Sequence, residues 1–593
     1  MTAGGRSYSC ESADKTMEWM TAIADVLRSF RLLLDAHVTN FFKDRLWETV
    51  DGEWMECLRK GPCRISSVSP VGWFGWEHWP ATLKGFVKTL KSLVLPRDPK
   101  SSNTIFDDFQ VAQLGSVLSQ GMNQKKKHEV EILSAVVSVV ASFVGAATVI
   151  DVGAGQGYLS QVLSFLYHLS VIALDASPHH ASVTSLRAER IKKHFTVKSR
   201  KSQNGTKLLH GPTTITSVLE SMIESSSCDN EHAGSPLVLA GLHACGDLSV
   251  NMLRTFIECE QVKAIVCISC CYNLLSDEQY AKSDSCSFPM SKGGKLLGLA
   301  LGRSARDLGC QPSILRKILV TYLMLENRKA CEHLKDERNK CMKISEERWR
   351  SFTKDAAIQN FELHAFRAAF QLILDKYYPS TLALTPAIGR QGKTLRRRQL
   401  RRVLNSQLDG GERSIEFSAK GQCDKESHLL TLQCAEAEAA NGHDRDCSCT
   451  TSDIKDVCGS SSKFCLFEEF SRAGLSRLGI ETQIILTSWE YGRMFNLSLY
   501  GLWISRSPFL FFSLIPFQQD FTPDLVVLMH LIMQDLIGPY WALHAALGPL
   551  VETYLLLDRL LFLQEQGDGV EVKMVPLFDP CCRRGMLLPN PRR

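Results

Sequence analysis

Short apolar runs, separated by glycines, acids and segments of mixed polarity, characterise residues 145–270 of this chain. Unbroken apolar runs of this length are typical of parallel strands that are buried on both faces. The predicted strands are residues 149–152, 171–174, 236–242 and 262–269. A weak additional strand is expected within residues 196–235, which are rich in Ser, Thr, Lys and Gly. The pattern predicts an α/β domain with a parallel sheet.

Apolar residues at three- and four-residue steps predict helices on either side of these strands. Residues 17–50 show this period, and another helix is expected to begin at 125–130 and to run to about Phe143. Residues 312–350 carry a strongly charged helical stretch, and residues 355–376 are amphipathic.

Residues 495–563 are unusually apolar. A membrane span needs roughly twenty uninterrupted apolar residues, but charged side chains interrupt this region before residue 536 and after residue 551. A buried helical layer is therefore favoured over a span. The uncharged segment 536–551 keeps the membrane alternative open, although Gly-Pro pairs break it.

At 593 residues, the chain exceeds one ordinary domain. Changes in composition predict five regions. They are a helical N-terminal region (1–104), an α/β domain (105–310), a charged helical region with a basic linker (311–402), a disordered insertion (403–463) and an apolar helical C-terminal region (464–593).

The net charge of +5 is too small to indicate a nucleic-acid partner by itself. The basic run at 393–402 is interpreted as a solvated linker, with a nuclear localisation signal or an RNA contact as the alternative. The first fifteen residues are polar and do not resemble a secretion signal. We therefore expect the 21 cysteines to be mostly reduced and the protein to be cytoplasmic or nuclear.

The most informative motif follows the first predicted strand, where Gly153, Gly155 and Gly157 alternate after Asp151. Glycines permit positive φ and let the backbone approach a ligand closely. Asp175, at the end of the second strand, is placed to accept hydrogen bonds from ribose hydroxyls. This spacing resembles motif I of class I S-adenosylmethionine methyltransferases rather than a dinucleotide fingerprint. The alternative is an ordinary turn between a strand and a helix.

Polar and reactive residues also follow the next two strands along the chain. His243 is a candidate general base, Asp247 a candidate carboxylate that orients it, and Tyr272 a candidate substrate platform or proton relay. Open α/β sheets bind ligands at the edge where these residues are expected. The alternative for His243 is a histidine whose hydrogen bonds are satisfied by the backbone.

Four cysteines lie in the same segments: Cys245, Cys267, Cys270 and Cys271. Cys267 is expected in the core. Together with His243, the others raise the alternatives of a metal site or a thiolate nucleophile, but the spacing alone predicts no metal.

The helix that precedes the first strand begins with a basic turn. Lys126, Lys127 or His128 could face the cofactor or an anionic substrate, or the turn could simply be solvated. Lys126 and His128 are retained as candidate cofactor-binding residues.

Several blocks of sequence together resemble the methyltransferase-like 25 family, and within it the B-type branch, which is also named for a ribosomal RNA adenine dimethylase domain. The blocks are residues 30–36 with 44–47, 121–122 with 125–130, 151–155, 241–248, 270–272, and 549–553 with 557–567. Residues 311–350, 403–463 and 488–545 depart from the family pattern as insertions.

The resemblance implies a class I methyltransferase domain with S-adenosylmethionine as its cofactor. By carry-over, Asp151, Gly153, Gly155 and Gly157 would hold the methionine end, and Asp175 the ribose. The neighbouring Ala154, Ala176 and Leu242 are further predicted cofactor contacts.

The acceptor is expected to be RNA or protein. Adenine N6 methyltransferases resemble one another in a proline-containing motif with Tyr or Phe after the fourth strand, and residues 242–246 lack both. Some tRNA ribose 2′-O-methyltransferases have a similar His-x-Cys-Gly segment, which keeps an RNA hydroxyl open. The alternative function is a non-catalytic cofactor-binding scaffold that engages a protein partner.

Overall fold

The computed structural model describes residues 8–60, 79–95, 111–201, 211–216, 235–276, 287–310, 366–375, 377–384, 536–567, 571–575 and 586–590, with short pieces between 471 and 480. The chain forms two compact units, residues 1–362 with 533–593, and residues 363–532. Predictions for residues 311–350, for the basic run 393–402 and for the insertion 403–463 lie outside the described residues.

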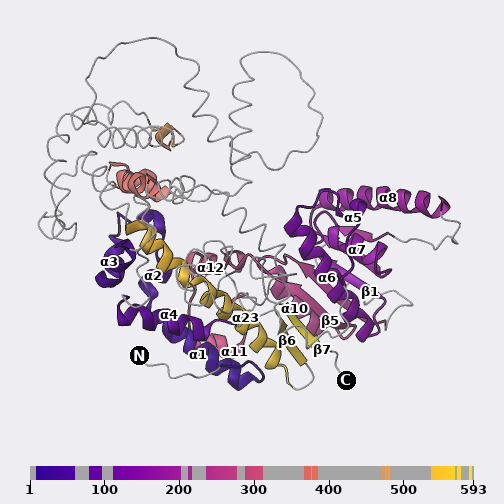
Figure 1. Cartoon of the computed structure of the whole chain (residues 1–593), viewed down its shortest axis with the longest axis horizontal. Coiled ribbons are helices and arrows are strands. Elements are labelled where there is room, and N and C mark those ends of the chain that lie inside the picture. Colours follow the sequence, from indigo (N-terminus) through magenta and orange to yellow (C-terminus); the bar gives the residue numbers. More distant parts are fainter. Residues whose placement is uncertain are drawn as a thin grey trace, which may run out of the picture. The chain divides into compact units, whose positions relative to one another are not determined.

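The described part of the first unit contains a seven-stranded sheet with the order β3-β2-β1-β4-β5-β7-β6 (Figure 1). Its strands are β1 (Thr148–Val152), β2 (Ser170–Asp175), β3 (Thr213–Thr216), β4 (Leu237–Leu242), β5 (Val262–Ile268), β6 (Glu571–Val575) and β7 (Met586–Asn590). Strands β1 to β5 are parallel, while β7 is antiparallel to both β5 and β6. The predicted class I Rossmann-like α/β core is confirmed.

The four predicted strands are β1, β2, β4 and β5, and the weak additional strand is β3. Strands β6 and β7 come from the end of the chain, about 300 residues after β5, and their pairing with β5 was not predicted. The predicted boundaries of the five regions stay a prediction.

In the described part of the chain, these helices pack on this sheet or on one another: α5 (Ser116–Ser119), α6 (Gln124–Phe143), α7 (Tyr158–Phe165), α8 (Pro178–Lys201) and α10 (Leu248–Glu258). The helix expected from 125–130 to Phe143 is α6, and the side chain of Asn123 caps it by accepting a 2.8 Å hydrogen bond from the Lys126 amide. Its apolar face packs with α7 and with the inner residues of β1, β4 and β5 in one buried cluster. This core positions the carboxyl ends of the strands.

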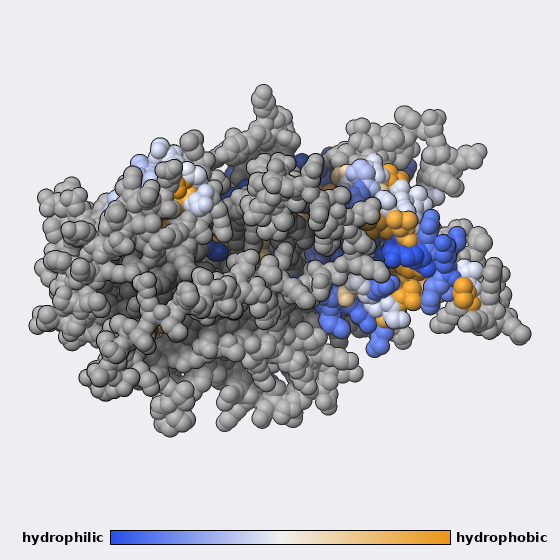
Figure 2. All heavy atoms as spheres, turned by 90° about the horizontal axis from the view of Figure 1, so that it is seen from above, coloured by the Kyte–Doolittle hydropathy of each residue, from blue (hydrophilic) through white to orange (hydrophobic). Residues whose placement is uncertain are grey.

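Helix α8 lies at the surface of this domain. Figure 2 shows a largely hydrophilic surface over it, with isolated apolar side chains. Among the apolar residues, Leu186 and Val197 are more than half exposed, whereas Ala188 and Ile191 are buried in a cluster with α7. The helix therefore covers the domain with one face and meets solvent with the other.

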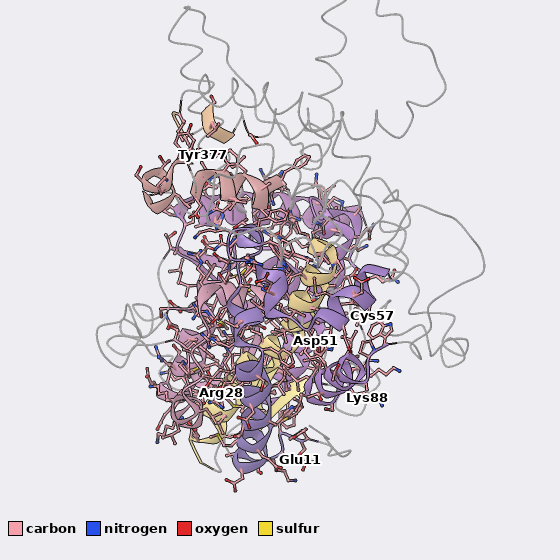
Figure 3. All side chains as sticks on the ribbon, turned by 90° about the vertical axis from the view of Figure 1, so that its left-hand side faces the viewer. Glu11, Arg28, Asp51, Cys57, Lys88 and Tyr377 are labelled. Carbon is pink, nitrogen blue, oxygen red and sulfur yellow. The ribbon has the colours of Figure 1, made fainter. Side chains whose placement is uncertain are left out.

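A helical layer packs beside the sheet within the same unit. It comprises α1 (Ala13–Ser29), α2 (Arg31–Asp35), α3 (Gly52–Lys60), α4 (Ala81–Leu93), α11 (Lys292–Leu297), α12 (Arg303–Cys310) and α23 (Gly548–Gln564). Helices α1, α11 and α12 all contact α23. Figure 3 looks onto this layer, and the labelled side chains of Glu11, Arg28 and Lys88 are exposed at its surface.

The prediction of one continuous helix over residues 17–50 is wrong, because the structure has several shorter helices there. Helix α1 ends at Ser29, α2 ends at Asp35, and two short 3-10 helices, Val38–Asn40 and Leu46–Thr49, follow. Ala36 is extended, with φ −60° and ψ 133°. The apolar period persists through these breaks, since Leu33, Leu34, Phe41 and Phe42 are all buried.

Nearly every residue of α23 is buried, including Glu552, Asp558 and Arg559. Such charges are tolerated only with partners. The Asp558 carboxylate accepts hydrogen bonds from the amides of Met290 and Ser291, at 2.8 and 3.1 Å, and from the Ser291 hydroxyl at 2.6 Å. The helix is thus anchored through polar contacts inside an apolar layer.

Among the described residues, no helix is long and apolar enough to cross a membrane.

Little of the second unit is described. Residues 366–375 are helical and α16 spans Pro379–Leu384. Phe366, Ala369 and Phe370 are buried, which confirms the amphipathic helix predicted there over its described part.

Candidate functional site

The glycine motif forms a tight turn between β1 and α7. Gly153, Gly155 and Gly157 have φ values of +73°, +59° and +70°, a region that side-chain-bearing residues rarely adopt. The amides of Gly153 and Ala154 donate to the Leu174 carbonyl at 2.8 and 3.0 Å. The turn is therefore held against the end of β2.

The three glycines are required for different reasons. A Cβ atom on Gly157 would lie 2.3 Å from Thr184 Cγ2, and one on Gly153 would lie 2.9 Å from Leu248 Cδ2. A Cβ atom on Gly155 would meet nothing closer than 4.0 Å. Packing within the protein explains two of the glycines, whereas the space beside Gly155 is left open.

Asp175 lies directly opposite this turn. Its carboxylate accepts hydrogen bonds from the amides of Gly155 and Ser177, at 2.8 and 2.9 Å, and lies 2.9 Å from His180 Nδ1. Partial burial disfavours the charged form, but the two amides and His180 outweigh it and lower the pKa of Asp175. The ends of β1 and β2 thus present an ionised carboxylate beside the glycine turn. The predicted contact of Asp175 with a ribose stays a prediction.

Asp151 occupies a different environment from Asp175. It is 2% exposed and accepts hydrogen bonds from the side chain and the backbone amide of Ser160 in α7. Burial is the largest influence and raises the pKa of Asp151 to about 6. Its predicted role at the methionine end stays a prediction, and its visible contacts fix α7 to β1.

Lys126 does not extend freely into solvent. Its Nζ lies 4.3 Å from the centre of the Tyr158 ring, and the Arg187 guanidinium lies 4.3 Å from the centre of the same ring. Partial burial is the main cause that lowers the pKa of Lys126, and Arg187 lowers it further. Both cations therefore contact the ring of Tyr158, the first residue of α7, next to the glycine turn. The sequence did not predict this arrangement.

The remaining predicted cofactor contacts differ in how far they are exposed. Ala176 is exposed after β2, Ala154 and His128 are half-buried, and Leu242 packs partly against both core clusters. Their contacts with a cofactor stay predictions.

His243 has a strained backbone, with a φ of +66° in the left-handed region. Its side chain is 34% exposed, and Nε2 lies 3.4 Å from the carboxylate of Glu129, a residue of α6 whose side chain is only 3% exposed. Its Nδ1 atom is buried and makes no hydrogen bond to the part of the chain that the structure describes. The histidine is therefore not satisfied by backbone groups, and its charged neighbour is Glu129.

Sequence reasoning missed Glu129 as a site residue. The available signal was its position on α6, since it shares one helix face with the buried Leu133 and Val136. A carboxylate on a face that otherwise enters the core is unusual unless it has a partner.

The predicted pairing of Asp247 with His243 is wrong. The Asp247 carboxylate accepts a 2.8 Å hydrogen bond from the amide of Ser276, and its backbone carbonyl accepts one from Asn251 in α10. Asp247 therefore connects the start of α10 to the loop after β5. Its carboxylate binds the nearby Ser276 amide and not His243.

Tyr272 is 1% exposed, so a substrate does not reach its ring in this structure. The Arg559 guanidinium lies 5.3 Å from the centre of this ring, and the Tyr272 amide donates to Cys310 Sγ at 3.0 Å. Burial is the largest of the influences that raise the pKa of Tyr272. The structure contradicts an exposed platform at this position, because α12 and α23 cover it.

Comparison with known proteins gives the class of the domain. Residues 125–278 match a family model described as a methyltransferase domain. The chain therefore contains a methyltransferase domain with a class I Rossmann-like core. No solved structure matches the chain.

Two curated relatives make the relationship more specific. Probable methyltransferase-like protein 25 of Homo sapiens is 24% identical over 307 residues, which cover 32% of this chain and 51% of that protein. The protein of the same name from Mus musculus is 26% identical over 306 residues, with the same shares. The chain spans about half the length of these relatives. Both are homologues, so the resemblance to methyltransferase-like 25 is confirmed, while the B-type branch stays a prediction.

Proposed function

We propose that this chain is a methyltransferase that uses S-adenosylmethionine. The observation that carries the proposal is the 2.8 Å hydrogen bond between the Gly155 amide and Asp175, which joins an open glycine turn to an ionised carboxylate at the ends of adjacent strands. A methyltransferase domain over residues 125–278 supports the same conclusion. When bound, S-adenosylmethionine supplies an electrophilic methyl group.

The residues present fit this cofactor. A carboxylate has about four positions that accept hydrogen bonds, and three donors already approach Asp175. Ribose hydroxyls would take the remaining position and compete with the half-exposed His180. The backbone of Gly153 and Gly155 would contact the methionine end, since no Cβ atom blocks approach to the turn.

Calorimetric titration of the full chain with S-adenosylmethionine tests the cofactor. We expect saturable binding that Asp175→Ala abolishes and that Asp175→Asn, which keeps an oxygen acceptor, weakens less. Asp14→Ala is the matched control, because Asp14 is an exposed aspartate in α1. Circular dichroism checks that each variant folds. Absence of binding by the unaltered chain would contradict the proposal.

His243 is the proposed acceptor of the proton that a hydroxyl or amine loses on methylation. Glu129 is its positioning residue, since a carboxylate within 3.4 Å can fix the orientation of the ring. Most of the remaining contribution to the rate is positioning of the acceptor against the methyl group.

Transfer of tritiated methyl groups to RNA and protein fractions tests these roles and separates the two acceptor classes. His243→Ala should retain cofactor binding and lose transfer. Glu129→Gln should lower kcat with the cofactor affinity unchanged, and Glu129→Asp should restore part of it. If Glu129→Gln and Glu129→Asp both keep full transfer, Glu129 has no positioning role.

The second candidate is a non-catalytic cofactor-binding scaffold that engages a protein partner. The burial of Tyr272 beneath α12 and α23 favours it, because that part of the edge is closed to an acceptor. Replacing Gly153 and Gly155 with bulky residues should abolish cofactor binding under either proposal, but should abolish cellular function only if the chain is an enzyme.

A further inference from the structure

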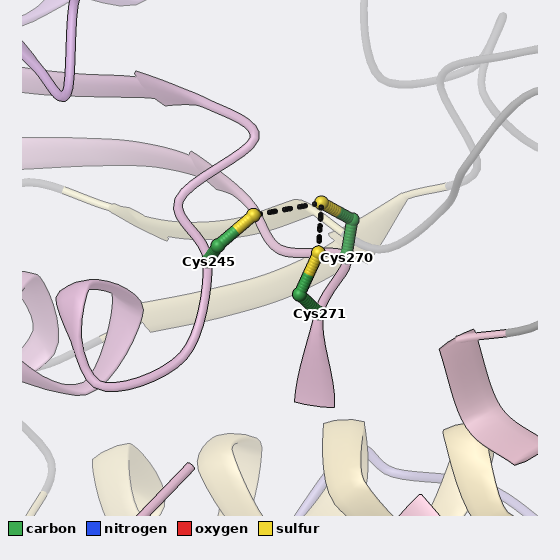
Figure 4. Close-up of side chains that lie close together, drawn as sticks. All are labelled: Cys245, Cys270 and Cys271. Atoms are coloured by element: carbon green, nitrogen blue, oxygen red, sulfur yellow. Dashed lines mark hydrogen bonds between the residues drawn. The ribbon is translucent and has the colours of Figure 1, made fainter. Parts of the chain in front are cut away.

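Three cysteine side chains from two loops meet at the carboxyl ends of β4 and β5. Figure 4 shows Cys245, Cys270 and Cys271 pointing toward one another. The Sγ atoms of Cys245 and Cys270 are 3.1 Å apart, and those of Cys270 and Cys271 are 3.5 Å apart. Within the described ranges, this is the one group of three or more His, Cys, Asp or Glu side chains whose ligand atoms could share a metal ion.

We propose that Cys245, Cys270 and Cys271 bind a soft, thiolate-preferring metal ion, for which Zn²⁺ is the test case. Thiolates are the ligands that select Zn²⁺ and Cu⁺ over harder cations. With a Zn–S distance of about 2.3 Å, tetrahedral geometry places sulfur atoms about 3.8 Å apart. The observed separations approach this value and need to widen by only about half an ångström on average.

The backbone holds the two loops together before any ion binds. The Ala244 amide donates to the Ile268 carbonyl at 2.9 Å, and the Gly246 amide donates to the Cys271 carbonyl at 3.2 Å. Gly246 has a φ of +58°, and a Cβ atom there would lie 2.8 Å from the Leu274 carbonyl oxygen. Cys245 lies between these hydrogen bonds, so its backbone is held beside the loop that carries Cys270 and Cys271.

The strained backbone of His243 also supports a site at the ends of β4 and β5. A non-glycine residue with φ +66° costs free energy, and such residues cluster where a site needs a particular geometry. The left-handed turn at residue 243 redirects the chain after β4 so that Cys245 approaches the loop after β5.

A buried positive charge lies next to the loop that carries Cys270 and Cys271. Three thiolates and Zn²⁺ carry a net charge of −1, and a buried charge needs compensation. Arg559, which is 4% exposed, hydrogen-bonds to the Ser269 hydroxyl one residue before Cys270. Binding releases one proton from each thiol, as metal binding to cysteine requires.

The described residues supply three ligands, and Zn²⁺ prefers four. In the proposal, a water molecule or another small ligand completes the shell. Cys245 and Cys271 are half-buried whereas Cys270 is 3% exposed, which leaves an approach from the side of the first two.

Metal titration of the reduced, chelator-treated full chain tests the proposal without any cofactor. Zn²⁺ binding is measured by competition with a chromophoric chelator, and Co²⁺ replaces it to give a spectrum diagnostic of tetrahedral thiolate coordination. We expect Cys245→Ser and Cys271→Ser each to remove one equivalent of high-affinity binding together with that spectrum. Cys57→Ser and Cys259→Ser are the matched controls, since both residues are half-buried cysteines outside the cluster.

Variants of Arg559, which is not itself a ligand, test whether this residue compensates the negative charge of the metal site. Arg559→Gln should weaken Zn²⁺ binding by about 10-fold or more, as is usual for residues that support metal ligands, and Arg559→Lys should weaken it less. Thermal unfolding monitors whether each variant folds.

Two outcomes would overturn the proposal. In one, the triple variant Cys245→Ser, Cys270→Ser, Cys271→Ser binds as much Zn²⁺ as the unaltered chain, with the same affinity. In the other, the cluster takes up no metal under reducing conditions, and mass spectrometry after exposure to air finds a Cys245–Cys270 disulfide. The cluster would then be a redox pair. Neither outcome depends on S-adenosylmethionine, so failure here is distinguishable from failure of the proposed function.

Discussion

The two halves of the sheet's carboxyl edge are built in different ways. The cofactor half, at the ends of β1 and β2, consists of the glycine turn and Asp175, held by backbone amides. The covered half, at the ends of β4 and β5, consists of the loops 243–247 and 269–273, over which α12 and α23 pack. Its contacts include the hydrogen bond from Arg559 to Ser269, between residues 290 positions apart.

The geometry of the two halves depends to different degrees on residues far away in the chain. The cofactor half is assembled almost entirely from residues 151–184, so its geometry follows from local conformation and close packing. The covered half needs a helix from the end of the chain and a partner loop at 290–293. Four changes test this contrast, from the largest expected effect to the smallest.

Asp558→Ala should destabilise the covered half most. It removes the acceptor for the Met290 and Ser291 amides in a buried environment, which costs about 3–5 kcal/mol of unfolding free energy. Urea denaturation of the full chain measures the loss. Asp35→Ala, which breaks an exposed pair with Arg31, is the control and should change stability by less than about 1 kcal/mol. Equal effects of the two variants would show that α23 is not anchored through Asp558.

Within the cofactor half, Gly157→Ala should be worse than Gly155→Ala. Both substitutions place an alanine at positive φ, which lowers the free energy of unfolding by about 1–2 kcal/mol. Only the Gly157 substitution also collides with the buried Thr184, which lowers it by a further amount of about 1–3 kcal/mol. Thermal unfolding measures both, and Thr184→Ala combined with Gly157→Ala should recover part of the difference. If Gly155→Ala is the more damaging variant, the space beside Gly155 is not open.

Asp151 should make stability depend on pH. Its pKa is about 6 in the folded chain and near 3.8 in the unfolded chain, so the folded state binds the proton more tightly. Its contribution to stability is therefore greatest below about pH 4 and falls as the pH rises to about 6, by at most about 3 kcal/mol. Unfolding midpoints of the chain and of Asp151→Asn over this interval measure it. Parallel pH profiles would mean that Asp151 does not titrate as its burial requires.

His180→Ala should have the smallest effect. The histidine is 42% exposed, so its interaction with Asp175 contributes less than about 1 kcal/mol. The Gly155 and Ser177 amides still hold the carboxylate, and calorimetry should find S-adenosylmethionine affinity close to that of the unaltered chain. A loss as large as that of Asp175→Ala would mean that His180, and not the backbone, positions the carboxylate.

The strands, the glycine turn and the position of Asp175 could be predicted from the sequence because each depends on neighbouring residues. An apolar run predicts a buried strand, and glycines in a turn predict positive φ. Asp247 shows where this reasoning ends. It is close to His243 in sequence, yet its carboxylate accepts from the Ser276 amide, while Glu129 arrives beside His243 from a helix over a hundred residues earlier.

Tyr272 and the cysteines show the same limit. Sequence position at the end of a strand predicted an accessible tyrosine, but burial depends on what packs above it, here α12 and α23. Cys267 was expected in the core and is buried there, because an unbroken apolar run predicts a strand that is buried on both faces. The meeting of Cys245 with Cys270 and Cys271 depends on the register between β4 and β5, which neither strand specifies alone.

By itself, the sequence determined the α/β domain, the turn that joins β1 to α7 and the acid that faces it, since apolar periodicity and glycine conformation act over a few residues. Only the tertiary structure decided which side chains meet across the edge: Glu129 with His243, Arg559 with Ser269, and three thiols with one another. Those pairings join residues far apart in the chain, and long-range packing and the compensation of buried charge select them.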